Sequence, residues 1–564
     1  MVEPASAALV PYLPRLVLDW MATDPDRRYR PVDGTMVFVD VSGFTALTER
    51  LARRGRVGAE ELTDILDRVF ARLLTVAWEL GGGLVKFGGD ALLLLFTDPD
   101  HAARATAAAY DMRTELDDIG RIDAFGEPIV LRMSVGIHSG RFDYFLVGDS
   151  HRELILTGPA ATTTVQMEAG ADAQQILVSP AVADAIGRQH VGDAAGGGFL
   201  LEQRPGTDPH LVELGDVGDV ALERCVPLAL RRHLLAGVTT SEHRMVTVGF
   251  VRFRGVDAML GQQGPDATAD ALHDLVSATQ RHVDEHGVTL LGTDVYDDGG
   301  KLILAAGAPE ASDNDEERML RALRGLFDEP LALTLTVGVN RGHVYAGDIG
   351  ASMRRTYTIM GDAVNLAARL MSAAQPGDIL TSGRVLDRSR TQFDVVALPA
   401  FHVKGKAQPV QAFRLGAVTG WQQVGGARAR LPLVGRDAEL AELLDALASA
   451  RAGRGQVIQL VGATGLGKSR LVEEVRLRAD ALAQYTVTCE QYEASTVYWP
   501  FRLLLRRLVD VPFDADPDEA GRRLEQFVRD HRPDLLPWLP LLAVPLDGAV
   551  ASTPEVEQLD ESFR

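Results

Sequence analysis

Cysteine is scarce in this chain of 564 residues, because only Cys225 and Cys489 occur and they stand far apart. Two isolated cysteines exclude a disulfide framework and a cysteine-rich zinc site. Long apolar runs are also missing: Ala91–Phe96 is as long as a strand, whereas a membrane helix needs about 18 apolar residues. Residues 1–4 show neither the basic region nor the apolar stretch of a secretion signal, so we expect a cytoplasmic protein.

An excess of positive charge is missing as well. The chain carries 57 Lys and Arg residues against 78 Asp and Glu residues, a net charge of −21. A nucleic-acid binder needs a basic surface to neutralise phosphates, so this balance excludes that class but leaves nucleotide binding open. The hydrophobic share of 46% and the charged share of 24% are typical of a globular protein. The length predicts roughly three or four domains.

An internal repeat is the strongest positive signal. Leu131–Gly140 matches Leu333–Gly342, and Ile176–Ser179 matches Ile379–Ser382, at an offset of 202 or 203 residues. A nearly constant offset predicts a duplicated domain.

Each copy combines apolar runs with helical patterns. In the first copy, Val37–Val41 and Leu92–Phe96 are predicted strands, and Glu60–Leu80 is a predicted amphipathic helix. Such elements predict a mixed α/β (α+β) domain with helices covering a sheet. Ahead of it, Ala8–Ala22 is predicted to form one short helix. The predicted divisions are an N-terminal helical segment (1–30), a first repeat domain (31–225), a linker (226–242), a second repeat domain (243–415), a linker (416–430) and a C-terminal domain (431–564).

Two carboxylates in the first copy suggest metal chemistry. Asp40 ends a predicted strand just before a turn at Gly43 and a predicted helix, where free backbone N–H groups favour phosphate. Asp90 follows Gly88-Gly89 between two apolar strands, which predicts a hairpin turn. Carboxylates beside a phosphate cradle suit a pair of magnesium ions. The alternative is that Asp40 caps a helix and Asp90 only serves a tight turn.

The second copy lacks this pair but has another. Arg252 stands at the position of Asp40, whereas Asn365 and Arg369 lie four residues apart on one predicted helix. A guanidinium suits charge spread over phosphate oxygens, although a helix surface contact is the alternative reading. The complementary losses predict one composite active site between the two halves.

These motifs carry a family resemblance. Over about residues 33–415 both halves resemble the class III nucleotidyl cyclases, and the arrangement resembles the soluble adenylyl cyclases. The motifs are Asp40–Thr45, Lys86–Asp90 and Asn365–Arg369. The resemblance implies two pseudo-symmetric cyclase domains, each with a ferredoxin-like sheet and covering helices, paired within one chain.

The resemblance also implies a reaction. Asp40, Asp90 and the Val41 carbonyl would hold two Mg²⁺ or Mn²⁺ ions. Asn365 would orient the ribose, and Arg369 would stabilise charge on the α-phosphate. ATP would then yield 3′,5′-cyclic AMP and pyrophosphate, as in intracellular signal transduction.

Further substrate contacts follow from the same resemblance. They are phosphate contacts at Gly43, Phe44 and Thr45, adenine recognition by Thr358, and a triphosphate contact from Lys404. For Lys404 a solvated loop is the alternative.

One position departs from the family pattern. Gly292 stands where the family places an adenine-contacting lysine, which leaves base selectivity open. Two alternatives to an adenylate cyclase therefore remain. One is a non-enzymatic pseudo-cyclase that senses nucleotide and regulates a fused ATPase. The other is a guanylate cyclase, against which Thr358 argues.

The mirror-related second site would combine Arg252 with Thr162 and Gln166, so it is not expected to catalyse the same reaction. We interpret Lys86 and Arg252 as marking a candidate regulatory pocket. Lys86 matches an anion-contacting residue of the soluble adenylyl cyclases, but the arginine that joins it there falls near Val165. This argues against bicarbonate as a regulator, and Lys86 supporting the Asp90 turn is the alternative.

The C-terminal domain carries a phosphate-binding loop after the predicted strand Val457–Val461. Its motif predicts that backbone N–H groups cradle phosphates and that Lys468 reaches the terminal phosphates, while Ser469 ligates magnesium. The motif residues are Gly462, Gly465, Gly467, Lys468 and Ser469. No apolar strand ending in paired acidic residues follows. We therefore predict a truncated P-loop ATPase domain that binds a second nucleotide without hydrolysing it.

Overall fold

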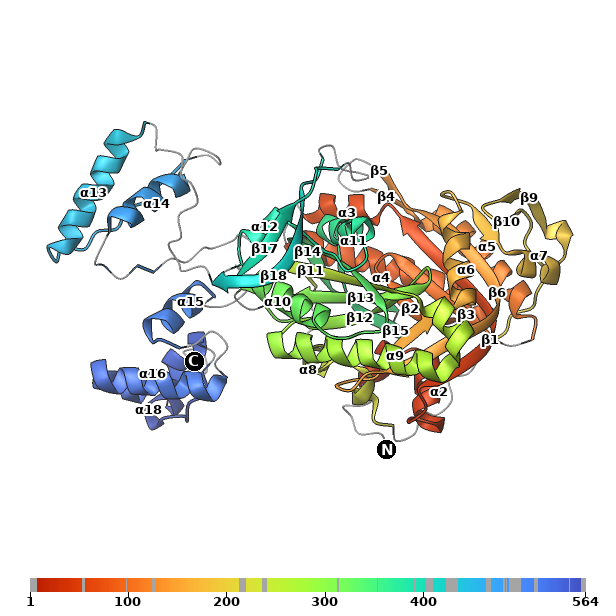
Figure 1. Cartoon of the computed structure of the whole chain (residues 1–564), viewed down its shortest axis with the longest axis horizontal. Helices are drawn as coiled ribbons and strands as arrows, with labels where there is room; N and C mark the ends of the chain where they lie inside the picture. The colour runs from red at the N-terminus through yellow and green to blue at the C-terminus, as the bar shows by residue number, and fades with distance from the viewer. Residues whose placement is uncertain are drawn as a thin grey trace. The chain divides into compact units, whose positions relative to one another are not determined.

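The computed structural model divides the chain into two compact units, Met1–Gln422 and Gln423–Arg564 (Figure 1). The structure describes residues 8–52, 56–97, 99–123, 128–211, 220–235, 241–311, 314–351, 353–389, 391–401, 409–421, 435–462, 468–479, 482, 484–485, 499–511, 516–546 and 548–558.

The first unit contains two eight-stranded sheets built to one plan, which confirms the predicted duplication and mixed α/β fold. The strand orders are β2-β3-β1-β6-β8-β10-β9 and β12-β13-β11-β14-β16-β18-β17, with β7 on β6 and β15 on β14. The first sheet comprises β1 (Tyr29–Ser42), β2 (Gly83–Gly88), β3 (Ala91–Phe96), β6 (Arg132–Val147), β7 (Glu153–Thr157), β8 (Ile176–Val178), β9 (Val191–Ala195) and β10 (Gly198–Leu201). The second comprises β11 (Glu242–Arg254), β12 (Thr289–Tyr296), β13 (Gly299–Ala306), β14 (Thr334–Ala351), β15 (Arg354–Met360), β16 (Ile379–Ser382), β17 (Thr391–Ala397) and β18 (Ala412–Trp421). A separate two-stranded sheet pairs β4 (Arg121–Asp123) with β5 (Pro128–Val130).

Helices cover these sheets. Those of the first half are α3 (Phe44–Ala52), α4 (Arg56–Glu79), α5 (His101–Ile119), α6 (Pro159–Ala169) and α7 (Pro180–Ile186). Those of the second half are α9 (Val256–His286), α10 (Asp315–Phe327), α11 (Asp362–Ala373) and α12 (Gly383–Leu386), preceded by α8 (Leu228–Leu235).

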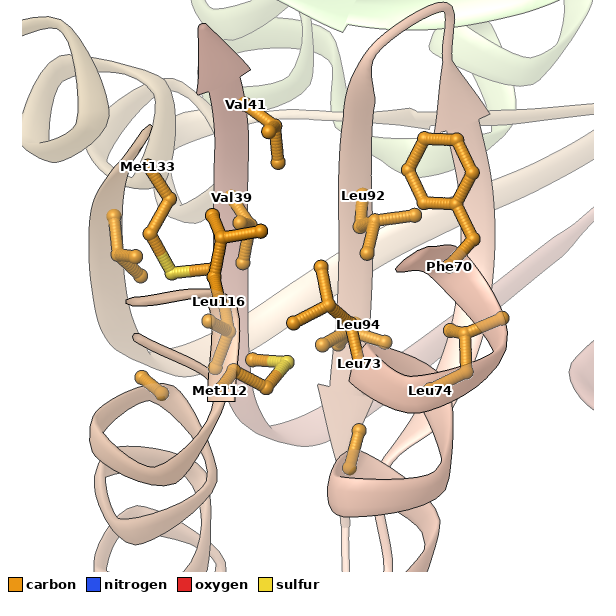
Figure 2. Close-up of a cluster of buried hydrophobic side chains, with 14 of the residues drawn as sticks. Val39, Val41, Phe70, Leu73, Leu74, Leu92, Leu94, Met112, Leu116 and Met133 are labelled. Atoms are coloured by element: carbon orange, nitrogen blue, oxygen red, sulfur yellow. The ribbon is translucent and has the colours of Figure 1, made fainter. Parts of the chain in front are cut away.

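The core of the first half lies on one face of its sheet. Figure 2 shows β1 and β3 side chains, among them Val39 and Leu94, packed against Phe70 of α4 and Met112 of α5. Side chains alternate between the faces of a strand, so burying Val39 and Val41 turns Asp40 to the opposite face. Strand periodicity therefore aims Asp40 away from this core.

The two halves share their cores. Tyr345 and Ile349 of β14 pack in the core of the first half, and Phe145 and Val147 of β6 pack in that of the second. Each long strand thus extends into the other half. This shared packing explains how residues of both halves can meet at the junction.

Three sequence-based boundaries differ from the structure. The predicted helix Ala8–Ala22 is interrupted: a short 3₁₀ turn, η1 (Val10–Tyr12), precedes α2 (Arg15–Thr23), because Pro14 has no N–H to continue a helix. The predicted linker 226–242 contains α8. The linker predicted from Gly416 begins inside β18, where Val418 pairs with Phe393 of β17, so strand pairing overrides the local glycines.

The second unit is helical in its described parts. Its helices are α13 (Asp437–Arg451), α14 (Lys468–Arg478), α15 (Trp499–Leu508), α16 (Pro517–His531), α17 (Leu539–Ala543) and α18 (Pro554–Glu557). The predicted strand Val457–Val461 is wrong: these residues have no regular structure, and both terminal valines are exposed. A strand requires a hydrogen-bonded neighbour, and no described residue of this unit pairs with the segment. Across the described residues of the whole chain, no helix is long and apolar enough to cross a membrane.

Candidate active site at the junction of the two halves

A cavity of about 240 Å³ lies between the two halves of the first unit. Five of the residues predicted for the composite site line it together: Asp40, Phe44, Asp90, Thr358 and Asn365. The first three belong to the first half, and the last two belong to β15 and α11 of the second half. The structure therefore brings together the carboxylates and the polar helix residue that the sequence separates.

The carboxylate pair lies on two backbone segments that contact each other. Gly89 and Asp90 form a two-residue turn between β2 and β3, which confirms the predicted hairpin. The N–H of Val41 donates to the carbonyl oxygen of Asp90 over 3.3 Å. Burial raises the pKa of Asp40, and burial together with the charge of Asp40 raises the pKa of Asp90 to about 7. Both carboxyl groups therefore share a poorly solvated region in which their negative charges repel.

This pair fits divalent cations with oxygen ligands. A bound cation would offset the burial of both carboxylates and the repulsion that raises the pKa of Asp90. Among the described residues, no group of three or more His, Cys, Asp or Glu side chains is arranged to hold a metal by itself. The remaining ligands would therefore come from backbone oxygens, water and substrate phosphates, which is the arrangement magnesium prefers.

The strand–turn–helix segment after Asp40 has the predicted form. Gly43 has φ +109°, and a Cβ there would lie 3.0 Å from Leu131 Cδ2 and 3.2 Å from the Val130 carbonyl oxygen. Only glycine suits that position. It lets α3 begin at once with Phe44, so the free N–H groups of its first turn lie near the cavity. Gly43 and Val41 do not line the cavity, and the Thr45 side chain lies outside the described residues.

Close packing positions α11. A Cβ on Gly338 of β14 would overlap the backbone of Met371 and Ala367, so the helix rests directly on the strand. Asn365 faces the cavity from this helix. Arg369 lies one turn later, is partly exposed and is not among the residues that line the cavity. Lys404 lies outside the described residues.

Strand register shows how the two copies correspond. Asp40 pairs with Ser134, and Arg252 pairs with Thr336 at the same place in the second sheet, which confirms their equivalence. Gly292 and Lys86 both follow the bulge in their hairpins, so Gly292 occupies in the second half the position of Lys86 in the first.

Three cavity-region residues were missed by the sequence reasoning. Lys301 and Asp294 line the cavity and form an ion pair of 2.9 Å. Glu168 of α6 accepts a hydrogen bond from Ser134 over 2.9 Å, and burial with the charge of Asp40 raises its pKa to about 7. The two hairpins differ in length, so aligning the copies by sequence did not place Lys301 and Asp294 at the site. Glu168 was missed because no motif surrounds it.

Lys86 and Arg252, grouped in one candidate pocket, lie in different surroundings. Lys86 donates to the carbonyl oxygen of Thr293 over 2.8 Å and to its hydroxyl, and lies 3.6 Å from Glu153. It lines a second cavity of about 120 Å³, which Arg252 does not line. Arg252 instead pairs with Asp297 at 2.7 Å.

An internal carboxylate neutralises Lys86. Burial alone would raise the pKa of Glu153, but His151 and Lys86 lower it to about 2. Glu153 therefore stays ionised beside the Lys86 ammonium, in the place where an external anion would meet it.

At the mirror-related site, contacts between the halves engage Thr162. Thr162 donates to Asp257 over 2.8 Å and accepts from the N–H of Asp298 over 3.0 Å. The Thr162 hydroxyl is thus engaged by the second half.

In the second unit, α14 begins at Lys468, whose ammonium donates to the carbonyl oxygen of Gly462 over 2.7 Å. Ser469 lies in the first turn of α14. Gly465, Gly467 and the Ser469 side chain lie outside the described residues.

Comparisons with known proteins agree with this organisation. A family model described as the adenylate and guanylate cyclase catalytic domain matches residues 27–201 and 238–417, more than half of the chain. A second model, described as an AAA ATPase domain, matches residues 432–561. The two cyclase matches fall on the two sheets.

Individual relatives are more distant. The chain is 23% identical to adenylate cyclase type 10 of Homo sapiens over 521 residues, which is 83% of this chain and 32% of that protein. It is 28% identical over 182 residues to the receptor-type guanylate cyclase gcy-6 of Caenorhabditis elegans, covering 30% of this chain and 16% of the relative. The chain thus spans a third or less of the length of these relatives. A class III adenylyl cyclase-like ATP-binding protein from Pseudomonas aeruginosa has a similar structure, with a TM-score of 0.47 and 13% identity over 68% of this chain and 92% of that chain.

Proposed function

The chain belongs to the adenylate and guanylate cyclase catalytic-domain family, and from this premise we propose that it is an adenylate cyclase. It would convert ATP to 3′,5′-cyclic AMP and pyrophosphate at one composite site. The observation that supports this most is that Asp40 and Asp90 from one half line the same cavity as Thr358 and Asn365 from the other.

The chemistry follows from the positions of these groups. Asp40 and Asp90, with the Val41 carbonyl, would hold two Mg²⁺ or Mn²⁺ ions. When bound, such ions lower the pKa of the attacking hydroxyl and offset charge on the leaving phosphates.

The other residues bind and orient the substrate. The N-terminal N–H groups of α3, at Phe44 and Thr45 after Gly43, would bind phosphate oxygens. Asn365 would hold the ribose so that its 3′-oxygen faces the α-phosphorus. Displacement then forms the 3′-oxygen–phosphorus bond and breaks the bond from the α-phosphorus to the oxygen that bridges to the β-phosphate, so pyrophosphate leaves and the hydroxyl proton passes to solvent. Thr358 would contact adenine, while Lys404 and Arg369 would contact the phosphates. The guanidinium would act as charge develops.

The second unit would bind a second nucleotide at Lys468 and the loop beginning at Gly462, since it matches an AAA ATPase domain. We further propose a cytoplasmic role in signal transduction, which the resemblance to the soluble adenylyl cyclases supports.

The test is product formation by the purified chain with ATP and either Mg²⁺ or Mn²⁺. Cyclic AMP and pyrophosphate in equal amounts are expected. Cyclic GMP from GTP at a higher rate would assign a guanylate cyclase instead.

A second candidate is a nucleotide sensor without turnover. It is favoured by Arg369, which does not line the cavity, and by Gly292, which offers no side chain to the base. Nucleotide binding with no cyclic product under either metal would support this candidate and reject the enzyme.

A further inference from the structure

A buried ion pair stands in the wall of the candidate active site. The Lys301 ammonium of β13 lies 2.9 Å from the Asp294 carboxylate of β12, directly across the strand pair. Their side chains are 21% and 4% exposed, and both line the cavity. Moving two charges out of water costs free energy, so a buried ion pair at this place suggests a function.

The fold does not require this pair. At the same two register positions of the first sheet stand Ala91 and Gly88, which pair with each other beside Asp40. That sheet forms a hairpin in the same place and strand order, with no charged side chain at either of these two positions. The ion pair is therefore a feature of the cavity and not of the sheet.

The surroundings of the pair suit a flat aromatic ring. The cavity wall around it is formed by Phe38, Phe87, Phe250 and Ile303, while the carboxylates Asp40 and Asp90 lie in the same cavity. The cations and the phosphates of a nucleotide would bind beside Asp40 and Asp90. The apolar walls would then contact its base. Apolar walls with a few placed polar groups are typical of a small-molecule site.

Lys301 and Asp294 are both positioned to bind a ligand. Burial would lower the pKa of Lys301, but the charge and hydrogen bond of Asp294, together with Tyr296 and Asp90, raise it, so the ammonium form is retained. Asp294 accepts from the N–H of Val295 over 2.8 Å through one oxygen and contacts Lys301 through the other. The pair thus presents one strong donor and one strong acceptor side by side.

We propose that Asp294 and Lys301 together select the base of the substrate, a purine nucleoside triphosphate with a 6-amino group. Lys301 donates to N1 of adenine, and Asp294 accepts from the 6-amino group. This inference rests on the proposed function, because it concerns the same cavity. It supplies the polar contacts that Gly292, lacking a side chain, does not make.

Two substrates separate this role from a structural one. Purine riboside triphosphate retains N1 but lacks the 6-amino group, so it loses the Asp294 contact alone. We expect the wild-type chain to prefer ATP by about 10- to 100-fold in kcat/KM, the range for a hydrogen bond to a charged group.

The decisive variant is Asp294→Leu combined with Lys301→Met. Replacing both partners with apolar residues leaves no unpaired buried charge, so the chain is expected to fold. The ATP preference should fall to about 1–3-fold, with most of the loss in ATP turnover. Lys301→Arg keeps the donor and should retain the preference. The matched control is Arg281→Met with Glu329→Leu, an ion pair of 2.9 Å on the surface of the same half, which should leave the preference unchanged.

Two results would overturn the proposal. One is an unchanged preference in the double variant, including an equal loss for both substrates, which would mark the pair as structural. The other is a wild-type chain that prefers GTP or shows no preference for ATP.

A second measurement tests base selection if the chain proves not to be a cyclase. If the wild-type chain forms no cyclic product, the same ratio is measured as a ratio of dissociation constants for ATP and purine riboside triphosphate. This titration uses full-length Lys468→Ala, in which binding by the second unit is weakened. A preference that the double variant loses would support base selection in a chain without turnover. Equal binding of both nucleotides by this chain would overturn it.

Discussion

The N–H of Val41 donates a hydrogen bond to the carbonyl oxygen of Asp90 over 3.3 Å. This bond joins the end of β1 to the turn between β2 and β3. Asp40 and Asp90, which are fifty residues apart in the chain, are thereby held beside each other at the cavity. The contact is backbone to backbone, so side-chain replacements at either aspartate leave it in place.

Asp90→Asn should lower cyclic product formation by about 100-fold or more, because the neutral amide binds a divalent cation weakly and does not offset its charge. The measurement is the initial rate over a series of Mn²⁺ concentrations. Asp297→Asn is the matched control, since Asp297 lies at the corresponding hairpin turn of the second half and pairs with Arg252. An Asp90→Asn chain with wild-type rates would reject the metal assignment.

Arg369→Ala should lower kcat by about 100- to 1000-fold with little change in KM, because the guanidinium is proposed to act on charge that develops during the reaction. The mirror position is Gln166, which is exposed, and Gln166→Ala should have wild-type kinetics. Steady-state rates with ATP decide this. A change in KM alone would assign Arg369 to binding and not to the reaction step.

Glu153→Gln should destabilise the first unit by on the order of 3 kcal/mol at pH 7, because it removes a carboxylate whose pKa is about 2 in the folded chain. The folded pKa lies below the ordinary value of 4.5, so this stabilisation is complete above about pH 4.5 and is lost as the pH falls toward 2. Urea unfolding across that range should show a weaker pH dependence in the variant.

The control for Glu153 is Glu329→Gln, because Glu329 pairs with Arg281 and His282 and its side chain is 25% exposed, against 11% for Glu153. Its effect should stay below about 1 kcal/mol, as for surface ion pairs. Equal changes in the free energy of unfolding would mean that burial of the Lys86–Glu153 pair does not add to its stabilising effect.

Leu94→Ala should cost about 2–5 kcal/mol in the free energy of unfolding, because Leu94 is fully buried between β3 and its covering helices (Figure 2). Val130→Ala, at an exposed position, should change it by less than about 0.5 kcal/mol. Chemical denaturation monitored by circular dichroism compares the two. A small effect at Leu94 would mean that the surrounding core closes over the cavity.

Lys468→Ala should weaken nucleotide binding by the second unit by about 10- to 100-fold, because it removes a charged donor from the phosphates. Binding of a fluorescent ATP analogue measures this. Arg476→Ala, on the same helix but near its other end, is the control. Cyclic product formation by the first unit should be unchanged in both variants.

Local patterns predicted the fold where the physical cause was local. The apolar run Val37–Val41 predicted a strand, and Gly88-Gly89-Asp90 predicted a tight hairpin. The same reasoning failed where pairing partners decide the outcome. Val457–Val461 has a strand composition without a described partner, whereas Val418 follows a glycine-rich pattern and still pairs within β18.

The candidate site divides in the same way. Asp40, Asp90 and Asn365 stand in recognisable motifs, so comparing the two copies was enough to propose that they meet, whereas Thr358 followed from the family resemblance. Asp294 and Lys301 stand in no motif, and their pairing depends on a hairpin that is longer than its counterpart in the first half. Glu153 and Lys86 come from separate strands whose approach depends on the junction between the halves.

By itself, the sequence determined the duplication, the α/β class and the complementary sets of catalytic candidates, because repeats, periodicities and motifs are properties of neighbouring residues. Only the tertiary structure decided which charges neutralise one another. Glu153 pairs with Lys86, and Asp297 pairs with Arg252. Asp294 pairs with Lys301 in the cavity wall. The physical reason is that electrostatic pairing depends on distance and burial in space, and both arise only when the two halves pack against each other.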